Sequence, residues 1–283
     1  MTKPIIAFMY DFDRTLCTRD MQEYSFIPEL GVDAATFWQQ VADLAETEHM
    51  DHIISYLYHM IKAANAKGLP LRRQDFVALG KDVELFPGVT SWFKRMNELG
   101  AELGLEIEHY IISSGLTEII EGTPIHQEFK KIYACEFHYD EFGIADWPAL
   151  TVNYTNKTQF LFRINKGVLP MNDDEALNEF LEDRDRRIPF RNMIYIGDGL
   201  TDVPCMKLVK INGGQSIAVY ENKERVVDLL TDRRVDFITP ANYEAGSELD
   251  QICQIILKKM ALVDQLVTLN HQQRDAESAE SRE

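Results

Sequence analysis

Short apolar runs that end in polar residues alternate with helix-like segments along most of the chain. The first run, Ile5 to Tyr10, is short enough for a strand buried on both faces. Further strands are predicted over 106–112, 193–196, 216–219 and 236–239, and helices over 87–100, 116–120, 157–165, 224–230 and 248–260. This alternation predicts an α/β fold in which helices cover a parallel sheet.

The segment between Cys17 and about Leu85 departs from this alternation. Apolar residues recur there at helical spacing over 37–44 and again over 53–61, and a further short helix is predicted from Arg72 to Leu79. No strand pattern intervenes. We therefore expect a helical insertion between the first strand and the rest of the sheet.

Three later segments carry their own patterns. The stretch CEFHYDEFGIA alternates in polarity around Gly143, which predicts a hairpin. The charge-dense segment from Asn172 to Arg187 predicts a solvated helix that carries its own ion pairs. Residues 264–283 become polar and are expected to form a frayed, exposed C-terminal tail without a catalytic role.

The composition limits the classes of partner. A chain of 283 residues with 45% apolar content can bury a large core, and its length favours one domain with an insertion. The net charge of −17 argues against binding to nucleic acid or to an anionic membrane, because such proteins need a basic surface. Any phosphate substrate must then be held by local positive charge.

The cysteines and the N-terminus favour a cytoplasmic protein. The 4 cysteines are widely spaced and form neither a zinc pattern nor a CxxC pair. The first apolar run meets Asp11 too early for a signal peptide, and no run approaches the roughly 18 apolar residues of a membrane span. We expect a soluble protein in a reducing compartment.

Two aspartates follow the first predicted strand directly. Asp11 and Asp13 are two residues apart, so in extended backbone both carboxylates point to the same side at the carboxyl end of the strand. Two like charges held together are costly unless a cation or a proton offsets them. The pair therefore indicates a catalytic site, and the alternative from this stretch alone is an ordinary strand end with turn aspartates.

Other predicted strand ends and one helix start supply complementary groups. The run 193–196 ends in GDGLTD, which contains Asp198 and Asp202, and the run 109–112 ends in Ser113, Ser114 and Gly115. Lys157 opens an amphipathic segment, where helix amides add to its charge at a phosphate; Lys166 is the alternative lysine.

Taken in this order, the segments resemble the haloacid dehalogenase superfamily, most closely its phosphoserine-phosphatase-like branch. The family's Asp-x-Asp-x-Thr is matched at residues 11–15, its Ser or Thr at a strand end by Ser113, its Lys by Lys157, and its GDGxxD at residues 197–202. The resemblance covers roughly residues 5–260. It implies a Rossmann-like core formed by residues 1–17 and 86–263, with a helical cap formed by residues 18–85.

The resemblance also implies a reaction, namely Mg²⁺-dependent hydrolysis of a small-molecule phosphate monoester through an aspartyl-phosphate. Asp11 is then the nucleophile and Asp13 the general acid and base. Ser113 donates to a phosphoryl oxygen, with Ser114 as alternative donor beside Gly115, and Thr15 fixes the turn after Asp11. Carboxylates of Asp11 and Asp198 and the main-chain carbonyl of Asp13 hold the metal, and Asp202 orients a metal-bound water or Lys157.

Several alternatives stay open in the sequence. Arg14 occupies a position where many relatives carry a small residue, and it either reaches the substrate or cap or projects outward. Asp20 stands where phosphoserine-specific relatives contact the substrate ammonium, but no cap arginine for the substrate carboxylate is evident. A phosphotransferase or mutase uses the same residues, and a non-catalytic phosphate-binding regulator is the third reading. The protein is expected to be a monomer or a homodimer.

Overall fold

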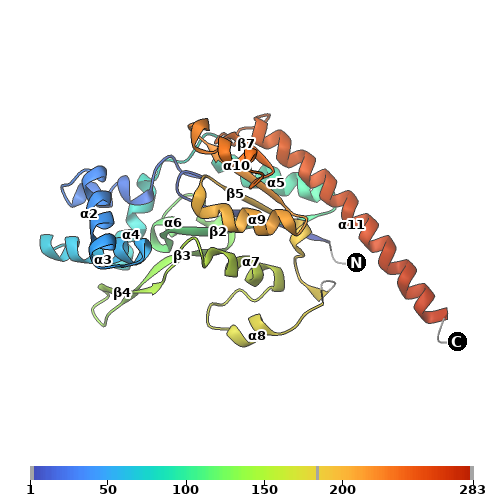
Figure 1. The fold of residues 1–283 in the computed structure, drawn as a ribbon, viewed down its shortest axis with the longest axis horizontal. Helices are drawn as coiled ribbons and strands as arrows, with labels where there is room; N and C mark the ends of the chain where they lie inside the picture. Colours follow the sequence, from blue (N-terminus) through green and yellow to red (C-terminus); the bar gives the residue numbers. More distant parts are fainter. Residues whose placement is uncertain (1–2, 183–184, 281–283) are drawn as a thin grey trace.

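A mostly parallel sheet forms the centre of the computed structural model, which describes residues 3–182 and 185–280 (Figure 1). Its 7 strands follow the order β4-β3-β2-β1-β5-β6-β7, and only β4 runs antiparallel to its neighbour. The strands are β1 (Ile5–Tyr10), β2 (Glu106–Leu116), β3 (Phe129–Tyr139), β4 (Ala145–Leu150), β5 (Met193–Gly197), β6 (Gln215–Tyr220) and β7 (Phe237–Pro240). The predicted α/β fold is confirmed.

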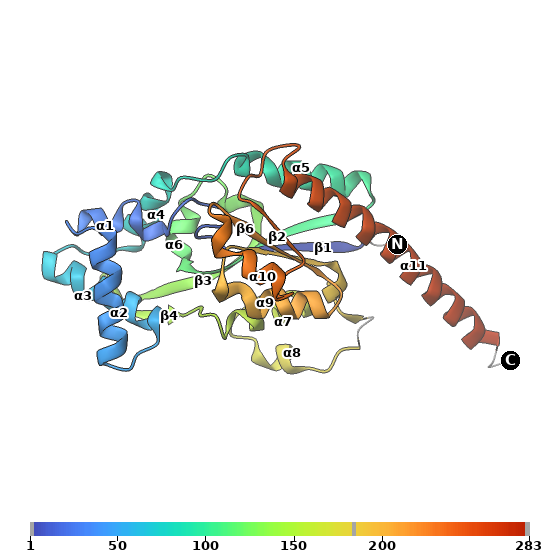
Figure 2. The same ribbon diagram turned by 45° about the horizontal axis from the view of Figure 1, so that its top comes forward.

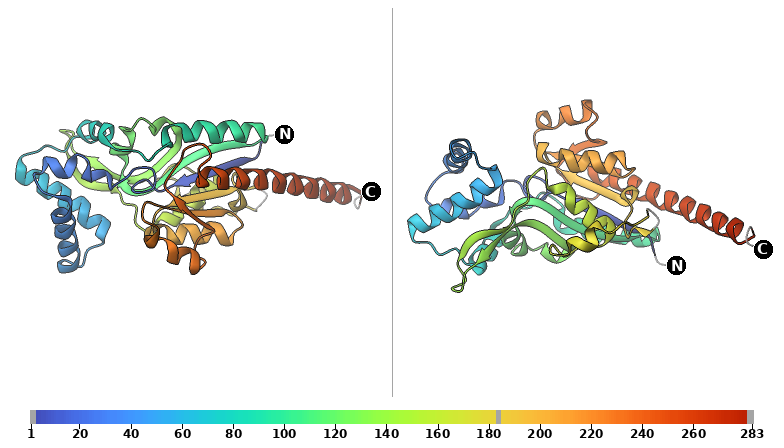
Figure 3. Two further views of the ribbon diagram at one scale, coloured as in Figure 1. Left: turned by 90° about the horizontal axis from the view of Figure 1, so that it is seen from above. Right: turned by 60° about the horizontal axis from the view of Figure 1, so that its bottom comes forward.

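Helices cover both faces of this sheet. On one face α5 (Val89–Glu102) packs against β2 and α11 (Glu248–Glu280) packs against α5 and β7. On the other face lie α7 (Lys157–Lys166) and α9 (Val203–Ile211), as Figures 1 and 3 show. Two short helices, α6 (Thr117–Glu121) and α10 (Val227–Thr231), follow β2 and β6. Strand β1 lies between β2 and β5, and its residues from Ile6 to Tyr10 are fully buried.

The segment between β1 and α5 is helical, as its periodicity predicts. It contains α1 (Phe26–Glu29), α2 (Ala34–Thr47), α3 (His52–Lys67) and α4 (Arg73–Leu79), with short 3-10 turns at Met21–Glu23 and Gly80–Asp82. These helices gather at one end of the sheet, opposite the end from which α11 projects (Figure 2). The two backbone segments that connect these helices to the sheet lie side by side. Cys17 pairs with Leu85, and the amide of Thr18 donates to the carbonyl of Glu84.

Part of this insertion is held against the sheet. Phe76 of α4 stacks on Phe137 of β3, with ring centroids 5.6 Å apart. Arg73 forms ion pairs with Glu121 at 2.7 Å and with Glu136 at 3.2 Å. The predicted hairpin is confirmed as β3 and β4, with Gly143 at a φ of 74° in its turn. Helix α4 is thereby fixed to α6 and to this hairpin.

Two sequence expectations about the charged segments are wrong. Within the described part of 172–187, helix is confined to α8 (Asp174–Asn178), because an exposed segment lacks burial to sustain it and Glu175 and Glu179 repel one another at helical spacing; residues 183–184 lie outside the described part. The C-terminal segment is helical rather than frayed: α11 continues past Met260 to Glu280. No glycine or proline interrupts that stretch, so helix propensity favours its continuation.

Strand β2 is longer than its apolar run. The expected strand stops at Ile112, whereas β2 extends to Leu116 and includes Ser113, Ser114 and Gly115. Its pairing with β3 shifts register between Ile112 and Leu116, so this extension is irregular. No helix in the described part of the chain has the length and apolar character needed to cross a membrane.

Candidate active site

The loop after β1 presents both aspartates at the carboxyl edge of the sheet. The amide of Asp11 donates to the carbonyl of Ile196 in β5 at 2.9 Å, so β5 continues to support the chain after β1 ends. Asp13 follows, and its Oδ1 accepts from the amide of Met21 at 2.8 Å. Asp11 is 6% exposed, which makes it a buried carboxylate that requires a cation or a proton.

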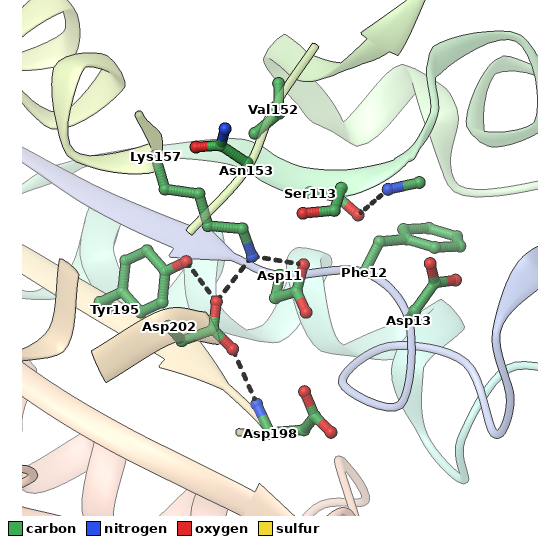
Figure 4. A network of polar contacts seen from close by, with 12 residues as sticks. Asp11, Phe12, Asp13, Ser113, Val152, Asn153, Lys157, Tyr195, Asp198 and Asp202 are labelled. Carbon is green, nitrogen blue, oxygen red and sulfur yellow. Dashed lines mark hydrogen bonds and ion pairs between the residues drawn. The ribbon is translucent and has the colours of Figure 1, made fainter. Parts of the chain in front are cut away.

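The turn after β5 brings two more aspartates to the same edge. Asp202 is fully buried; its Oδ1 accepts from the hydroxyl of Tyr195 at 2.8 Å and its Oδ2 from the amide of Asp198 at 3.2 Å. Gly197 is required beneath this turn, because a Cβ there would lie 2.4 Å from Oδ2 of Asp202. The side chain of Asp198 points toward Asp11 (Figure 4).

Lys157 joins these two loops. It is the first residue of α7, and its Nζ donates to Oδ1 of Asp11 at 3.0 Å and to Oδ1 of Asp202 at 2.7 Å (Figure 4). Its side chain is 1% exposed. Lys166 lies at the far end of α7, where its Nζ contacts the backbone carbonyls of Leu177 and Glu179. Of the two lysines, the structure brings Lys157 to the aspartates.

Burial and mutual repulsion raise the pKa values of three of these carboxyl groups. Burial is the largest cause for Asp11, whose pKa rises to about 6 although Lys157 opposes the rise. Burial, then Asp11 and Asp202, raise the pKa of Asp198 to about 8. Burial, then Asp20 and Asp11, raise the pKa of Asp13 well above its ordinary value. Burial lowers the pKa of Lys157, but Asp11 and Asp202 outweigh it, so the lysine stays charged.

The carboxylates form a set that suits a divalent cation. One oxygen from each of Asp11, Asp198 and Asp202 lies within 4.8 Å of the others. Hydrogen bonds already occupy both oxygens of Asp202, whereas no side chain in the described part of the chain hydrogen-bonds to Oδ2 of Asp11 or to either oxygen of Asp198. Hard, anionic oxygens are the ligands that Mg²⁺ prefers. Asp11 and Asp198 therefore fit as ligands, and Asp202 fits as the residue that positions Lys157.

The serines of β2 line the opposite side of the site. Ser113 is buried, and its Oγ accepts from the amide of Gly115 at 3.0 Å, which leaves its own proton available to a ligand. The carbonyl of Ser114 accepts from the hydroxyl of Tyr56 in α3 at 2.6 Å. Gly115 lies close to Asp13 and Met21, where a Cβ would approach the Cε of Met21 to 2.1 Å.

Arg14 and Asp20 form an ion pair with two hydrogen bonds. Nε of Arg14 donates to Oδ1 of Asp20 at 3.2 Å, and Nη2 donates to Oδ2 at 2.9 Å. Arg14 has a φ of 57°, a left-handed conformation uncommon for arginine, and it also lies 3.8 Å from Glu23. Both oxygens of Asp20 are thus occupied. Thr15 is buried, its Oγ1 has no partner in the described part of the chain, and its carbonyl accepts from Tyr243.

A pocket of about 650 Å³ opens over these groups. Its lining combines residues from the loops after β1, β5 and β6 with residues of β2, α3 and α7: Asp11, Asp13, Arg14, Asp20, Ile53, Ser113, Ser114, Lys157, Asp198, Gly199, Leu200, Thr201 and Arg225. The site is therefore open to a small molecule and is bordered by the helical insertion.

Residues 8–207 match the family model of the haloacid dehalogenase-like hydrolases. The chain belongs to this family. A protein of Borreliella burgdorferi, described as an uncharacterized protein, is 31% identical over 273 residues, which cover 87% of this chain and 94% of that protein.

Solved structures of this hydrolase family share the fold. A HAD family hydrolase of Salmonella enterica serovar Typhi superposes with a TM-score of 0.59 at 16% identity, covering 90% of this chain and 72% of that one. A substrate-bound phosphoserine phosphatase gives a TM-score of 0.56 at 13% identity, with coverages of 89% and 99%. Cytosolic 5′-nucleotidase IIIB bound to cytidine gives 0.52 at 14% identity, with coverages of 92% and 87%.

Several residues at this site carry no clear signal in the sequence. Tyr195 lies inside an apolar run and is indistinguishable there from a core residue, yet it holds Asp202. Asn153 accepts from the amide of Asn156 just before α7, and its Nδ2 donates to Asp51 at the start of α3. Arg225 follows β6 in an exposed turn. Only the tertiary structure places these residues around the aspartates.

Proposed function

We propose that the protein is a Mg²⁺-dependent phosphomonoesterase that hydrolyses a small-molecule phosphate through an aspartyl-phosphate on Asp11. The observation that carries this proposal is that the two carboxylate oxygens of Asp11 differ in their contacts. Lys157 holds Oδ1 at 3.0 Å, while no side chain in the described part of the chain hydrogen-bonds to Oδ2. A carboxylate fixed at one oxygen and open at the other is oriented for in-line attack on phosphorus.

The raised pKa values suit Asp11 to the role of nucleophile and Asp13 to the role of general acid. A pKa of about 6 leaves Asp11 ionised at pH 7 and above, as a nucleophile must be. Burial raises the pKa of Asp13 well above its ordinary value, which favours the protonated form that a general acid needs. Two adjacent carboxyl groups in different environments thereby take opposite roles.

The reaction proceeds in two displacements. In the first, Asp11 Oδ2 forms a bond to phosphorus, the ester P–O bond breaks, and the proton of Asp13 passes to the departing alcohol. In the second, Asp13 takes a proton from water, the water oxygen attacks phosphorus, and the bond between phosphorus and Asp11 breaks, releasing phosphate. Ser113 donates to a phosphoryl oxygen, and Lys157 keeps Asp11 oriented. Asp11, Asp198 and the carbonyl of Asp13 would hold Mg²⁺, which would supply positive charge to the phosphoryl oxygens.

We also propose that residues 18–85 act as a cap on a core formed by 1–17 and 86–263. Support comes from the pairing of Cys17 with Leu85, where the chain leaves and returns. Ile53 of α3 lines the pocket, and Tyr56 of the same helix bonds to Ser114. A cap in this position excludes water and contacts the leaving group.

The test is hydrolysis of p-nitrophenyl phosphate by the purified protein, with Mg²⁺ or with a chelator, beside Asp11→Asn. We expect metal-dependent release of p-nitrophenol that falls by at least about 10³-fold in Asp11→Asn while far-UV circular dichroism is retained, because an amide is a poor nucleophile. Substantial activity in Asp11→Asn would refute the nucleophile, and equal activity in chelator would refute the metal.

A further inference from the structure

The charged groups that line the pocket are mostly paired with one another. Asp20 is bound at both oxygens by Arg14, and Lys157 lies between Asp11 and Asp202. Asp13 accepts from the amide of Met21. Arg14 and Lys157 offset the charge of Asp20, Asp11 and Asp202, which weakens the attraction of these carboxylates for a substrate ammonium.

Arg225 is the exception among the cationic side chains described in the pocket lining, since Arg14 and Lys157 are both paired. Its guanidinium forms no hydrogen bond or ion pair with the described residues, although it lines the pocket that contains Asp11, Ser113 and Lys157. A second hollow, lined by Tyr220 and Asn222 among others, also has Arg225 in its wall. Arg225 is therefore the cation of the described lining whose guanidinium is open to a ligand, beside the open carboxylate of Asp198.

The backbone that carries Arg225 is well defined. Arg225 ends a 3-10 turn, Lys223–Arg225, directly after β6. The side chain of Asn222 accepts from the amide of Glu224 at 3.0 Å and its carbonyl accepts from the amide of Arg225 at 3.2 Å, which caps the turn. Asp198 and Arg225 line the same two hollows, so Arg225 lies near the proposed metal site.

We propose that Arg225 binds a second anionic group, a carboxylate or a phosphate, carried by the alcohol portion of the phosphate monoester. This inference rests on the proposed function and specifies the substrate class. The planar guanidinium matches two oxygens of either group and stays charged at all relevant pH values. The protein has a net charge of −17, which repels an anionic substrate. A local cation such as Arg225 is therefore needed to hold the second anionic group of the substrate.

The kinetic test uses substrate pairs that differ in the second anion. Phosphoglycolate is compared with ethyl phosphate, and fructose 1,6-bisphosphate with fructose 6-phosphate, at saturating Mg²⁺. We expect one of the anionic members to have the higher kcat/KM, and Arg225→Gln to reduce that selectivity ratio about tenfold, as loss of a charged hydrogen-bonding partner does. The pair that shows the effect distinguishes carboxylate from phosphate. Arg225→Lys, which keeps the charge but loses the fork, gives an intermediate ratio.

Lys223→Gln is the matched control, because Lys223 lies in the same turn, is exposed and does not line the pocket. It removes the same charge from the surface and is expected to keep the selectivity ratio of the unmodified protein. A ratio near one for both substrate pairs in the unmodified protein would overturn the proposal. So would an unchanged ratio in Arg225→Gln.

A binding measurement separates this inference from the proposed function. Calorimetry of the Mg²⁺-loaded protein compares 3-phosphonopropionate with propylphosphonate, and methylenebisphosphonate with methylphosphonate; none of these ligands can be hydrolysed. Tighter binding of an anionic member, reduced about tenfold in Arg225→Gln, supports the role of Arg225 even if no ester is turned over. Equal affinities in both pairs refute it even if p-nitrophenyl phosphate is hydrolysed.

Discussion

Replacing Lys157 with methionine tests whether this lysine is the cation that makes the acidic cluster stable. Nζ of Lys157 lies 3.0 Å from Asp11 and 2.7 Å from Asp202, and these carboxylates are 8% and 0% exposed. Methionine fills similar space but leaves both charges unpaired. Removing one partner of a buried ion pair costs about 3–5 kcal/mol of the free energy of unfolding. At about 2 °C per kcal/mol for a chain of this size, the melting temperature falls by about 6–10 °C.

The loss should depend on pH in a definite direction. The folded-state pKa values of Asp11 and Asp198 are raised to about 6 and about 8, above those of unfolded carboxyl groups. The folded state therefore binds more protons than the unfolded state between about pH 4 and pH 8, so the metal-free fold loses stability as the pH rises through that range. Without Lys157 these pKa values rise further, so Lys157→Met is most destabilised at pH 8.5 and least at pH 6.

The assay is thermal unfolding followed by circular dichroism at pH 6 and pH 8.5, in chelator and in Mg²⁺. Lys166→Met is the control, because Lys166 lies in the same helix but contacts backbone carbonyls. Its effect should not depend on pH over this range or on the metal. A fall of less than about 2 °C for Lys157→Met at pH 8.5 in chelator, or an equal fall at both pH values, would refute the reasoning.

Three further outcomes follow from the site. Asp13→Asn should slow turnover of an alkyl phosphate by about 10²-fold or more. It should slow the first displacement on p-nitrophenyl phosphate less, because that leaving group needs little protonation. Burst kinetics measure this step, and equal slowing of the burst for both substrates would contradict the acid role. Arg14→Ala should raise KM more than it lowers kcat, because it leaves Asp20 an unpaired anion in the pocket; unchanged steady-state kinetics would remove Arg14 from the site. The affinity for Mg²⁺ should weaken severalfold from pH 8.5 to pH 6.5, since protons compete for Asp198; titration calorimetry that shows no pH dependence would count against Asp198 as a ligand.

Local patterns in the sequence were sufficient to predict most of the elements. The apolar runs at 5–10 and 193–196 become β1 and β5, and the periodic segments between residues 34 and 79 become α2, α3 and α4. These predictions succeed because burial imposes a spacing on each element separately. They fail for 172–187 and for residues after Met260, where few side chains are buried and charge repulsion or helix propensity decides the outcome.

The sequence by itself also determined which chemical groups stand at the ends of the strands, because carboxyl ends of parallel strands share one edge of a sheet. It could not determine how those groups pair. The contacts of Lys157 with Asp11 and Asp202, of Tyr195 with Asp202 and of Tyr56 with Ser114 join different elements. Such contacts depend on how the loops and the helical insertion pack together, and residue spacing along the chain does not encode that packing.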